Sequence, residues 1–419
     1  MNTKKRAVIT GIGIISPYGM GVDKFWNSLI EGKSGISTIE NISPEGHSVH
    51  VAGEIKRFEE EISNLDSKES RRMDRYTQFA MMAADEAVKD SKLEVENLDP
   101  YRFGVIVGSA AGGFGTFEKQ HLVIIERGPS KCSPFTVPMI IADMGAGRIS
   151  MRYGAKGVNK AIVTACATSA HCIGDSLRAI QYGEADVIIA GGAEAVITRL
   201  GIGAFTSART LSKRNDEPEK ASRPYDVDRD GFVMSEGAAI VVVEELEHAK
   251  KRNAKIYAEI VGYGQTGDAY DIVAPDPTGQ GAAKAMEFAV KDAGLEPKDI
   301  KYINSHGTST GLGDIAESKA IAQVFGDLSV NKDLKVSSTK SMHGHMLGAT
   351  GAAETIVCLK VINEGIIPPT INLEHQDEKV ADLNYVPNHA IKADIDCALS
   401  NSFGFGGHNA SLIFKKYEK

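Results

Sequence analysis

The residues Ala161–Ser169, "AIVTACATS", decide the fold, because an apolar β-branched run stops there at a cysteine flanked by small residues. The run Lys160–Ala165 is typical of a buried strand, and Thr168 and Ser169 are typical of the start of a helix. Cys166 then lies at a strand-to-helix bend, where its sulfur is exposed as in a nucleophile elbow. The positive end of the helix dipole favours a thiolate at this position. Cys166 is therefore a candidate nucleophile, and a small buried apolar cysteine is the alternative that position alone leaves open.

Outward from this stretch, strand-like and helix-like segments alternate along the chain. Residues 75–91 and 173–183 have apolar side chains at helical spacing. Short continuous apolar runs of the first half lie at 6–15, 103–109, 160–165, 186–192 and 237–245. Continuous apolar strands that alternate with amphipathic helices predict an α/β fold whose sheets are covered on both faces.

The second half of the chain repeats this plan. Its strand-like segments lie at 255–264, 300–309, 334–341 and 409–416, with helix-like segments at 281–294 and 351–362. Gly231-Phe232 precedes Gly404-Phe405 by 173 positions. The pair Val163-Thr164, just before the cysteine, precedes Val336-Ser337 by the same 173 positions. The sequence therefore predicts a duplicated α/β unit.

We expect the duplication to divide the chain into two domains, residues 1–253 with the cysteine and residues 254–419 with the candidate histidines. The first half is longer because it contains inserted material, notably residues 15–100 and 114–158. We expect these insertions to cap a site and to form a dimer surface. No low-complexity segment or linker separates the two halves.

Composition bounds the class of protein. With 42% hydrophobic and 24% charged residues, the 419-residue chain is typical of a globular protein with a large core. A net charge of −8 argues against nucleic acid as a bulk partner. The five cysteines include no C-x-x-C pair, which fits a reducing compartment and predicts no metal site. No run approaches the ~18 apolar residues of a membrane span, so we expect a cytoplasmic protein without membrane contact.

Polar side chains that could carry chemistry follow two strand-like runs of the second half. His306 lies in "INSHGTSTGLGD", and Lys340, His343 and His345 lie in "VSSTKSMHGHMLGATGAAE". Equivalent strand ends meet in a duplicated α/β fold, so these histidines and the cysteine of the other half predict one convergent site. The glycine-dense stretch Asn401–Ser411, "NSFGFGGHNAS", predicts a loop whose backbone N–H groups approach a ligand.

Four ordered motifs, "TACATS", "HGTST", "STKSMHGH" and "NSFGFGGHN", resemble the condensing enzymes of fatty-acid synthesis. The resemblance spans essentially the whole chain and is to the beta-ketoacyl-[acyl-carrier-protein] synthases I and II, leaning to type II. It implies a thiolase-like fold, with duplicated βαβαβαββ halves in a layered α-β-α-β-α structure, and a homodimer. The implied reaction is a decarboxylative Claisen condensation that extends a fatty-acid chain. No cofactor is implied, because phosphopantetheine arrives on the acyl carrier protein.

The resemblance also assigns roles to residues of this chain. Cys166 would take the acyl group, and His306 and His345 would stabilise the enolate formed when malonyl-carrier loses carbon dioxide. The backbone N–H groups of Cys166 and Phe405 would hold the tetrahedral oxyanion, and the Phe405 ring would gate the acyl pocket. The other matched positions are the catalytic lysine Lys340, the supporting residues Glu354 and Asp314, and the substrate-binding residues Ala111, Thr308 and Thr310.

Three positions depart from the family's pattern. His343 stands where the family usually has threonine or another uncharged residue, and we expect it to add a third imidazole close to the active site. Val273 stands where a threonine often binds pantetheine, which puts that contact in doubt. Ala111 stands where an isoleucine often forms the floor of the acyl pocket.

The partner implied by the resemblance is acyl carrier protein, which is acidic, as this chain is. Local positive charge therefore has to dock it, and such a patch would act mainly on the association rate. The candidate docking residues are Lys68, Arg71 and Arg72, which match the family's docking patch, together with Lys131 and Arg209.

Other classes of protein were weighed against this interpretation. A thiolase should carry a second catalytic cysteine in a C-x-G motif near the C-terminus, where this chain has "GFGGHN". A type III synthase pairs one histidine with an asparagine, whereas two histidines stand here. A non-catalytic chain-length factor lacks the cysteine. A polyketide condensing enzyme is harder to exclude, although a free-standing chain of 419 residues favours fatty-acid elongation.

Overall fold

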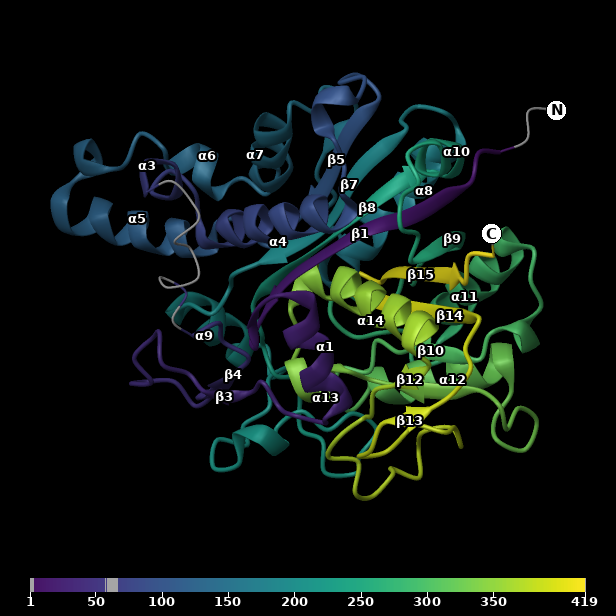
Figure 1. Cartoon of the computed structure of the whole chain (residues 1–419). Coiled ribbons are helices and arrows are strands. Elements are labelled where there is room, and N and C mark those ends of the chain that lie inside the picture. The colour runs from purple at the N-terminus through teal and green to yellow at the C-terminus, as the bar shows by residue number, and fades with distance from the viewer. Residues whose placement is uncertain (1–3, 57, 59–66, 419) are drawn as a thin grey trace.

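Eleven strands form one mixed sheet in the computed structural model, which describes residues 4–56, 58 and 67–418 (Figure 1). Each half of the chain contributes five strands to its main path, and the short β2 (Gly19–Met20) pairs with β1 beside this path. The first half supplies β1 (Ala7–Ser16), β5 (Phe103–Gly108), β6 (Asn159–Lys160), β7 (Val187–Glu194) and β8 (Gly237–Glu245). The second half supplies β9 (Ala258–Gly267), β10 (Tyr302–Asn304), β11 (Lys335–Ser337), β14 (Cys397–Gly404) and β15 (His408–Lys415).

The two sets of strands have the same topology. Their orders are β6-β5-β7-β8-β1 and β11-β10-β14-β15-β9, and each reads 3-2-4-5-1 when its strands are numbered along the chain. The first strands of the two sets, β1 and β9, pair antiparallel over Ala7–Ile9 and Ala258–Ile260. This repeated strand order confirms the duplication predicted from the 173-residue offset between the two halves.

Helices cover the strands in the predicted layers. The helices α8 (Thr168–Gln181) and α14 (Thr350–Glu364) each contact strands of both halves, so they form a layer between them. α4 (Arg75–Ser91) and α7 (Met144–Tyr153) cover the outer face of the first half, and α11 (Gln280–Ala293) covers that of the second, beside α12 (Gly313–Phe325). The α-β-α-β-α arrangement is confirmed.

The strand β1 is buried along its whole length, and its glycines allow α4 to lie directly on it. A Cβ atom at Gly13 would stand 2.2 Å from the carbonyl oxygen of Ala83, and one at Gly11 would stand 2.2 Å from that of Ala87. The predicted helix over 75–91 has these bounds in the structure, and the Asp74 side chain caps it by accepting from the N–H of Tyr76. The outer helix and the sheet thus touch backbone to backbone.

Two expectations about local structure are wrong in detail. The strand expected over 160–165 ends at Lys160, because β6 is an edge strand paired only with β5 at Val105 and Ile106. The stretch Asn401–Ser411 is mostly strand, since β14 and β15 pair from Cys397 to Lys415 and leave only Phe405–Gly407 between them. The expected glycine loop is therefore a tight hairpin.

The remaining elements connect these layers. They are β2 (Gly19–Met20), α1 (Val22–Ile30), β3 (Ser37–Thr38), β4 (Val51–Ala52), α3 (Ser67–Ser70), η2 (Val95–Asn97), α5 (Phe114–Arg127), η3 (Pro129–Lys131), α6 (Thr136–Ile140), η4 (Ala165–Ala167), α9 (Arg199–Ser207), η5 (Pro218–Lys220), α10 (Leu246–Lys251), η6 (Pro297–Asp299), α13 (Lys340–His343), η7 (Leu347–Ala349), β12 (Ile366–Ile367) and β13 (Ile391–Lys392). Within the described part of the chain, no helix is both long and apolar enough to cross a membrane.

Candidate active site

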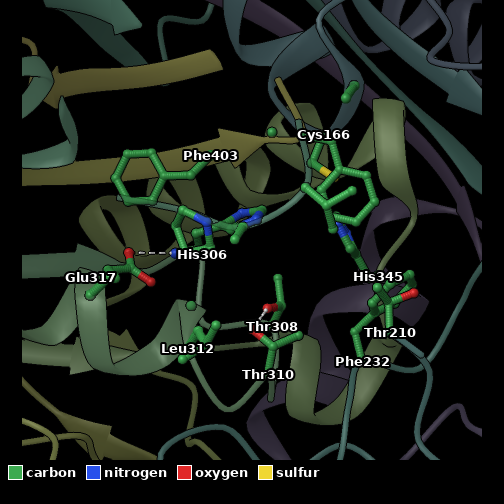
Figure 2. A pocket seen from close by; sticks show the side chains of 18 of the residues that line it. Cys166, Thr210, Phe232, His306, Thr308, Thr310, Leu312, Glu317, His345 and Phe403 are labelled. Atoms are coloured by element: carbon green, nitrogen blue, oxygen red, sulfur yellow. Dashed lines mark hydrogen bonds between the residues drawn. The ribbon is translucent and has the colours of Figure 1, made fainter. Parts of the chain in front are cut away.

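A cavity of roughly 770 Å³ lies where the ends of strands from both halves meet. Figure 2 shows Cys166, His306 and His345 directed into it from three separate segments. Most of the predicted site residues line this cavity, namely Ala111, Cys166, Arg209, His306, Thr308, Thr310, His345 and Phe405. The convergence that the sequence predicts is therefore present in the fold.

Cys166 lies in the single turn η4, directly before α8. The residue before it, Ala165, has a positive φ of 50°, which L-residues rarely adopt and which marks a sharp bend. The β14 backbone approaches this bend so closely that a Cβ atom at Gly404 would stand 2.6 Å from the Thr164 carbonyl oxygen. The sequence predicts a bend here, but the expected exposure of the sulfur is wrong, because Cys166 is buried, with only 7% of its surface exposed.

The ionisation of Cys166 differs from the expectation. Burial raises the pKa of its thiol to about 12, and nearby Lys340 and the backbone N–H groups of Phe405 and Cys166 itself oppose this rise. The helix dipole favours the thiolate less than burial disfavours it, so the dipole alone does not determine the ionisation of Cys166. In the free protein the thiol keeps its proton at neutral pH.

His306 follows β10, and a buried carboxylate holds its backbone. Glu317 accepts from the backbone N–H of His306 at 2.8 Å and from that of Gly307 at 2.7 Å (Figure 2). The side-chain amide of Asn401 donates to the same carboxylate at 3.2 Å. Glu317 is not among the residues predicted from the sequence. The signal in the sequence is an acidic residue on the inward face of α12, beside Ala320 and Ile321.

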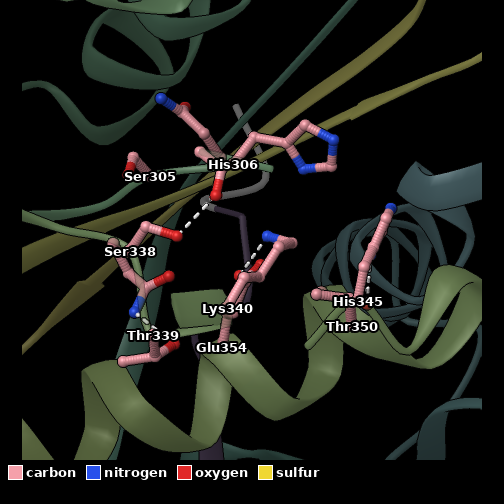
Figure 3. A network of polar contacts seen from close by, with 12 residues as sticks. Ser305, His306, Ser338, Thr339, Lys340, His345, Thr350 and Glu354 are labelled. Atoms are coloured by element: carbon pink, nitrogen blue, oxygen red, sulfur yellow. Dashed lines mark hydrogen bonds and ion pairs between the residues drawn. The ribbon is translucent and has the colours of Figure 1, made fainter. Parts of the chain in front are cut away.

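His345 is held at both its backbone and its ring. Its backbone N–H donates to the Val233 carbonyl at 2.8 Å, and its carbonyl accepts from the Ser235 N–H at 2.9 Å. The ring Nδ1 lies 2.9 Å from the hydroxyl of Thr350, at the start of α14 (Figure 3). The Nε2 atom is buried without a hydrogen-bond partner among the described residues.

The three side chains form a compact group. The Cys166 sulfur and one ring nitrogen from each of His306 and His345 lie within 4.8 Å of one another. The two imidazole rings meet edge to face, with centroids 5.4 Å apart. Burial, and then the charge of Lys340, hold the pKa of both imidazoles well below the ordinary value. Both rings are therefore neutral at pH 7 and can donate an N–H hydrogen bond.

Lys340 and Glu354 form a buried ion pair beside this group, as Figure 3 shows. The ammonium group is 1% exposed and the carboxylate is fully buried. Burial raises the pKa of Glu354 to about 8, and Lys340 opposes the rise. Neither residue lines the cavity, so the pair acts on the histidines through its field and not by contact with a ligand.

Asp314 holds the turn that follows His306. Its carboxylate accepts from the backbone N–H of Ser309 at 3.1 Å and from that of Tyr225 at 2.9 Å, and Arg229 lies 3.6 Å away. This contact set agrees with the expected structural role. It presents the hydroxyls of Thr308 and Thr310, which lie 3.1 Å apart, at the cavity wall (Figure 2).

Ala111 belongs to a wall that a second unpredicted carboxylate organises. Fully buried Glu194 accepts from the backbone N–H groups of Ala110 at 2.8 Å and Ala111 at 3.2 Å. It also accepts from the N–H of Gly348 at 3.0 Å, three residues after His345. Glu194 thus ties the wall to the histidine turn. The acid that ends the apolar run of β7 was its signal in the sequence.

The hairpin after β14 closes one side of the cavity. Phe405 lies near the ring of Phe205, with centroids 6.4 Å apart, and the glycines that follow it have positive φ angles of 81° and 73°. The Gly406 N–H donates to the Ile272 carbonyl at 2.9 Å, which joins the hairpin to the loop that holds Val273. Val273 lines the cavity with an apolar side chain where a hydroxyl was expected from the resemblance.

His343 does not line the cavity, although it lies close enough to His345 to lower the pKa of that imidazole. Its ring is fully buried on α13, 5.7 Å from the ring of Phe25, and its Nε2 lies 3.0 Å from the Thr339 hydroxyl. Burial lowers the pKa of His343 to about 3, so the ring is neutral. It is a packed core side chain.

The predicted docking residues are all on the surface, but they do not form one group around the cavity. Only Arg209 lines it, whereas Lys68, Arg71 and Arg72 precede α4. The Arg72 guanidinium lies 4.7 Å from the ring centroid of Phe135, so its segment lies beside the one that contains Lys131.

The fold and the site define a class: a duplicated α/β enzyme whose cavity brings together one cysteine thiol and two neutral imidazoles. Domain models of beta-ketoacyl synthase match the chain, the N-terminal domain at residues 4–249 and the C-terminal domain at 257–374. The chain belongs to the beta-ketoacyl synthase family, so it is a condensing acyltransferase.

Individual relatives agree with this assignment. The chain is 52% identical over 418 residues to the 3-oxoacyl-[acyl-carrier-protein] synthase 2 of Staphylococcus aureus strain N315, with 100% of both chains covered. It is 48% identical to the enzyme of that name from Synechocystis sp., with 99% of both covered. A beta-ketoacyl synthase from Burkholderia phymatum has a TM-score of 0.90 at 33% identity, covering 99% of this chain and all of its own.

Another solved neighbour is described as a type II PKS acyl-carrier protein in complex with its ketosynthase. It has a TM-score of 0.90 at 34% identity, and the alignment covers 99% of this chain and 100% of that one. These neighbours confirm the thiolase-like ketosynthase fold that the motifs predict.

We expect the substitution His343→Thr to leave malonyl decarboxylation near the wild-type rate, because the ring lies outside the cavity. It should lower the free energy of unfolding by about 1–3 kcal/mol through the space it leaves in the core. Decarboxylation assays and urea unfolding measure the two effects. The comparison variant is His345→Ala, and a loss of activity in His343→Thr as large as in that variant would contradict the site described here.

Proposed function

We propose that this chain is a 3-oxoacyl-[acyl-carrier-protein] synthase of type II, in which Cys166, His306 and His345 carry out the condensation of malonyl-carrier with an acyl primer. The observation that carries the proposal is the placement of one thiol and two neutral imidazoles within 4.8 Å in one cavity. A decarboxylative Claisen condensation needs a nucleophile for the acyl group and two N–H donors for the enolate oxygen.

In the first step, the Cys166 sulfur attacks the thioester carbonyl of acyl-carrier. The carbon–sulfur bond to pantetheine breaks, the acyl group remains on Cys166, and the thiol proton ends on the departing pantetheine sulfur. The backbone N–H groups of Cys166 and Phe405 lie beside the sulfur and are suited to hold the oxyanion of the tetrahedral intermediate. Because burial raises the thiol's pKa, the proton leaves as the sulfur attacks the substrate carbonyl and not before.

In the second step, malonyl-carrier occupies the same cavity and loses carbon dioxide. The negative charge that develops on its thioester oxygen accepts hydrogen bonds from the neutral His306 and His345 rings. The enolate carbon then attacks the acyl carbon on Cys166, the carbon–sulfur bond to the enzyme breaks, and the released thiolate takes up a proton. Lys340 biases both rings toward the neutral form, because its positive charge opposes a second one nearby.

Because the two steps use different residues, substitution of Cys166 and substitution of a histidine should impair different activities. Cys166→Gln should abolish condensation but keep malonyl decarboxylation, since the histidines remain. His306→Ala and His345→Ala should each lower decarboxylation by about 10²–10³-fold, because each removes one donor to the enolate oxygen. Carbon dioxide release and 3-oxoacyl product are measured separately. Condensation by Cys166→Ser at the wild-type rate would remove the nucleophile assignment.

We propose that the size of the side chain at position 111 determines which acyl-chain lengths the cavity accepts, and that the small Ala111 admits long ones. It lies in the wall held by Glu194, and a small residue there leaves room for longer or branched primers. Each buried methylene contributes about 0.8 kcal/mol, so the added space favours longer chains by several-fold.

The series Ala111→Ile and Ala111→Phe tests this role. We expect condensation with long acyl primers to fall progressively with side-chain size, while short primers and malonyl decarboxylation are spared. The measurement is kcat/KM for a ladder of acyl-carriers. An equal loss at every length would mean that position 111 does not border the acyl chain.

We propose that acyl carrier protein docks through Lys68, Arg71 and Arg72, with Lys131 on the neighbouring segment and Arg209 at the cavity. Support comes from the solved neighbour described as a ketosynthase in complex with its acyl-carrier protein. Arg71→Glu should raise KM for acyl-carrier several-fold at low salt, and added salt should remove the difference. Lys89→Glu, at the other end of α4, is the control with the same charge change. Equal effects of the two variants would contradict the patch.

We also propose that the chain is a homodimer whose interface includes α5, α6 and the edge strand β6. Large apolar side chains of α5 and α6 are exposed in the single chain, including Phe117, Ile125 and Val137. Val163, which follows β6, is exposed as well and also lines the cavity. Isolated exposed apolar residues are common, but a group of this size indicates a contact surface. A monomer in sedimentation equilibrium at micromolar concentration would refute this assembly. We retain residues 1–253 and 254–419 as the two domains, which carry the nucleophile and the histidines.

The alternative of a polyketide ketosynthase is less well supported. Solved structures of that kind share the fold at 34% identity, whereas the curated 3-oxoacyl-[acyl-carrier-protein] synthases are 52% identical over the full length. Elongation of fatty-acyl primers is therefore the proposed reaction.

A further inference from the structure

The condensing triad has the composition of a metal site as well as that of a catalytic one. One thiol and two imidazoles, all buried, come within 4.8 Å of one another, and thiolate and imidazole are the ligands that Zn²⁺ prefers. Metal chemistry has no part in the proposed condensation. We propose that Cys166, His306 and His345 also form a binding site for a thiophilic divalent cation such as Zn²⁺, whose occupancy blocks the enzyme reversibly.

The geometry needs only a small adjustment. A tetrahedral zinc ion with Zn–S of about 2.3 Å and Zn–N of about 2.1 Å places its ligand atoms roughly 3.3–3.6 Å apart. The three ligand atoms lie within 4.8 Å of one another in the free protein, so they must approach one another by at most about 1.5 Å to bind the ion. Rotation of the Cys166 and His306 side chains supplies this movement, while His345 stays fixed by Thr350.

The Thr350 hydroxyl, which contacts the ring of His345, is compatible with both condensation and metal binding. Condensation needs a proton on Nε2, whereas metal binding needs the Nε2 lone pair and therefore a proton on Nδ1. The Thr350 hydroxyl beside Nδ1 can donate to it or accept from it, so it accommodates either tautomer. A partner of this kind also orients the ring of a metal-binding histidine. The buried Nε2 has no other hydrogen-bond partner among the described residues.

The surroundings supply a fourth ligand and balance the charge. The triad faces a cavity of roughly 770 Å³, from which a water molecule can complete the tetrahedron. The positive charge that acts most strongly on the three ligands is that of Lys340, and it is paired with Glu354. Arg209 and Arg229 also line the cavity, and Arg229 is paired with Asp314 and Asp377. Binding replaces the thiol proton with the metal, so one proton is released for each ion bound.

Metal binding and acylation exclude each other, because both use the Cys166 sulfur. A bound ion also occupies the two nitrogens that the enolate oxygen requires. This consequence for activity rests on the proposed function, but the binding itself does not. Binding can therefore be measured on the free protein without any substrate.

Titration of the reduced, full-length protein with Co²⁺ tests the site. We expect one ion per chain, with the intense visible absorption of tetrahedral cobalt and a thiolate charge-transfer band, and Zn²⁺ should displace it. Cys166→Ser, His306→Ala and His345→Ala should each weaken binding by more than about 100-fold, since even outer partners of metal ligands contribute 10–100-fold. Cys132→Ser, which removes a thiol outside the cavity, should bind as the wild type does.

Two further measurements decide between the site and adventitious binding. Acylation or carboxamidomethylation of Cys166 should abolish the cobalt spectrum, and Zn²⁺ inhibition should compete with acyl-carrier and be reversed by EDTA. Cys166→Ser changes one atom, so a folded Cys166→Ser protein that keeps the spectrum and the stoichiometry would overturn the proposal. An octahedral spectrum in the wild type would overturn it as well. If cobalt binds as expected but condensation is absent, the proposed function fails and this site stands.

Discussion

The close contact of α8 with α14 is the constraint on which the rest of the structure depends. A Cβ atom at Gly351 would stand 2.9 Å from the Cβ of Ala170, so only glycine allows the two helices this approach. The Ser169 hydroxyl accepts from the Ala352 N–H at 2.9 Å at the same point. Cys166 lies just before the first helix and His345 just before the second, so this contact determines their separation.

Buried charge then supports the site from behind. Three carboxylates carry this support: Glu194 binds the pocket wall and the His345 turn, Glu317 binds the His306 backbone, and Glu354 pairs with Lys340. Charges in a protein interior are costly unless their hydrogen bonds are satisfied, and these are placed where they hold catalytic segments. Burial raises the pKa of Glu194 and Glu317 to about 7, which is the measure of that cost.

The same burial determines the protonation of the reactive groups. It keeps the Cys166 thiol protonated and the two imidazoles neutral, with Lys340 as the nearest full charge. A neutral imidazole can donate a hydrogen bond to an enolate and can also bind a metal through its lone pair. The catalytic and the proposed metal-binding properties thus come from one arrangement, and the tautomer of His345 separates them.

The sequence by itself determined the alternating α/β pattern, the duplication and the candidate residues Cys166, His306 and His345, because these depend on local periodicity and on motifs near strand ends. The helix over 75–91 and the bend before α8 were predictable for this reason. Only the tertiary structure decided the short edge strand β6, the core position of His343 and the rise in the Cys166 pKa. The sequence predicted that the thiol and the two imidazoles, from positions 140 and 179 residues apart, converge, but only the tertiary structure showed that they lie within 4.8 Å of one another. Burial and the distances between side chains arise from contacts between distant segments, and no local pattern in a chain encodes them.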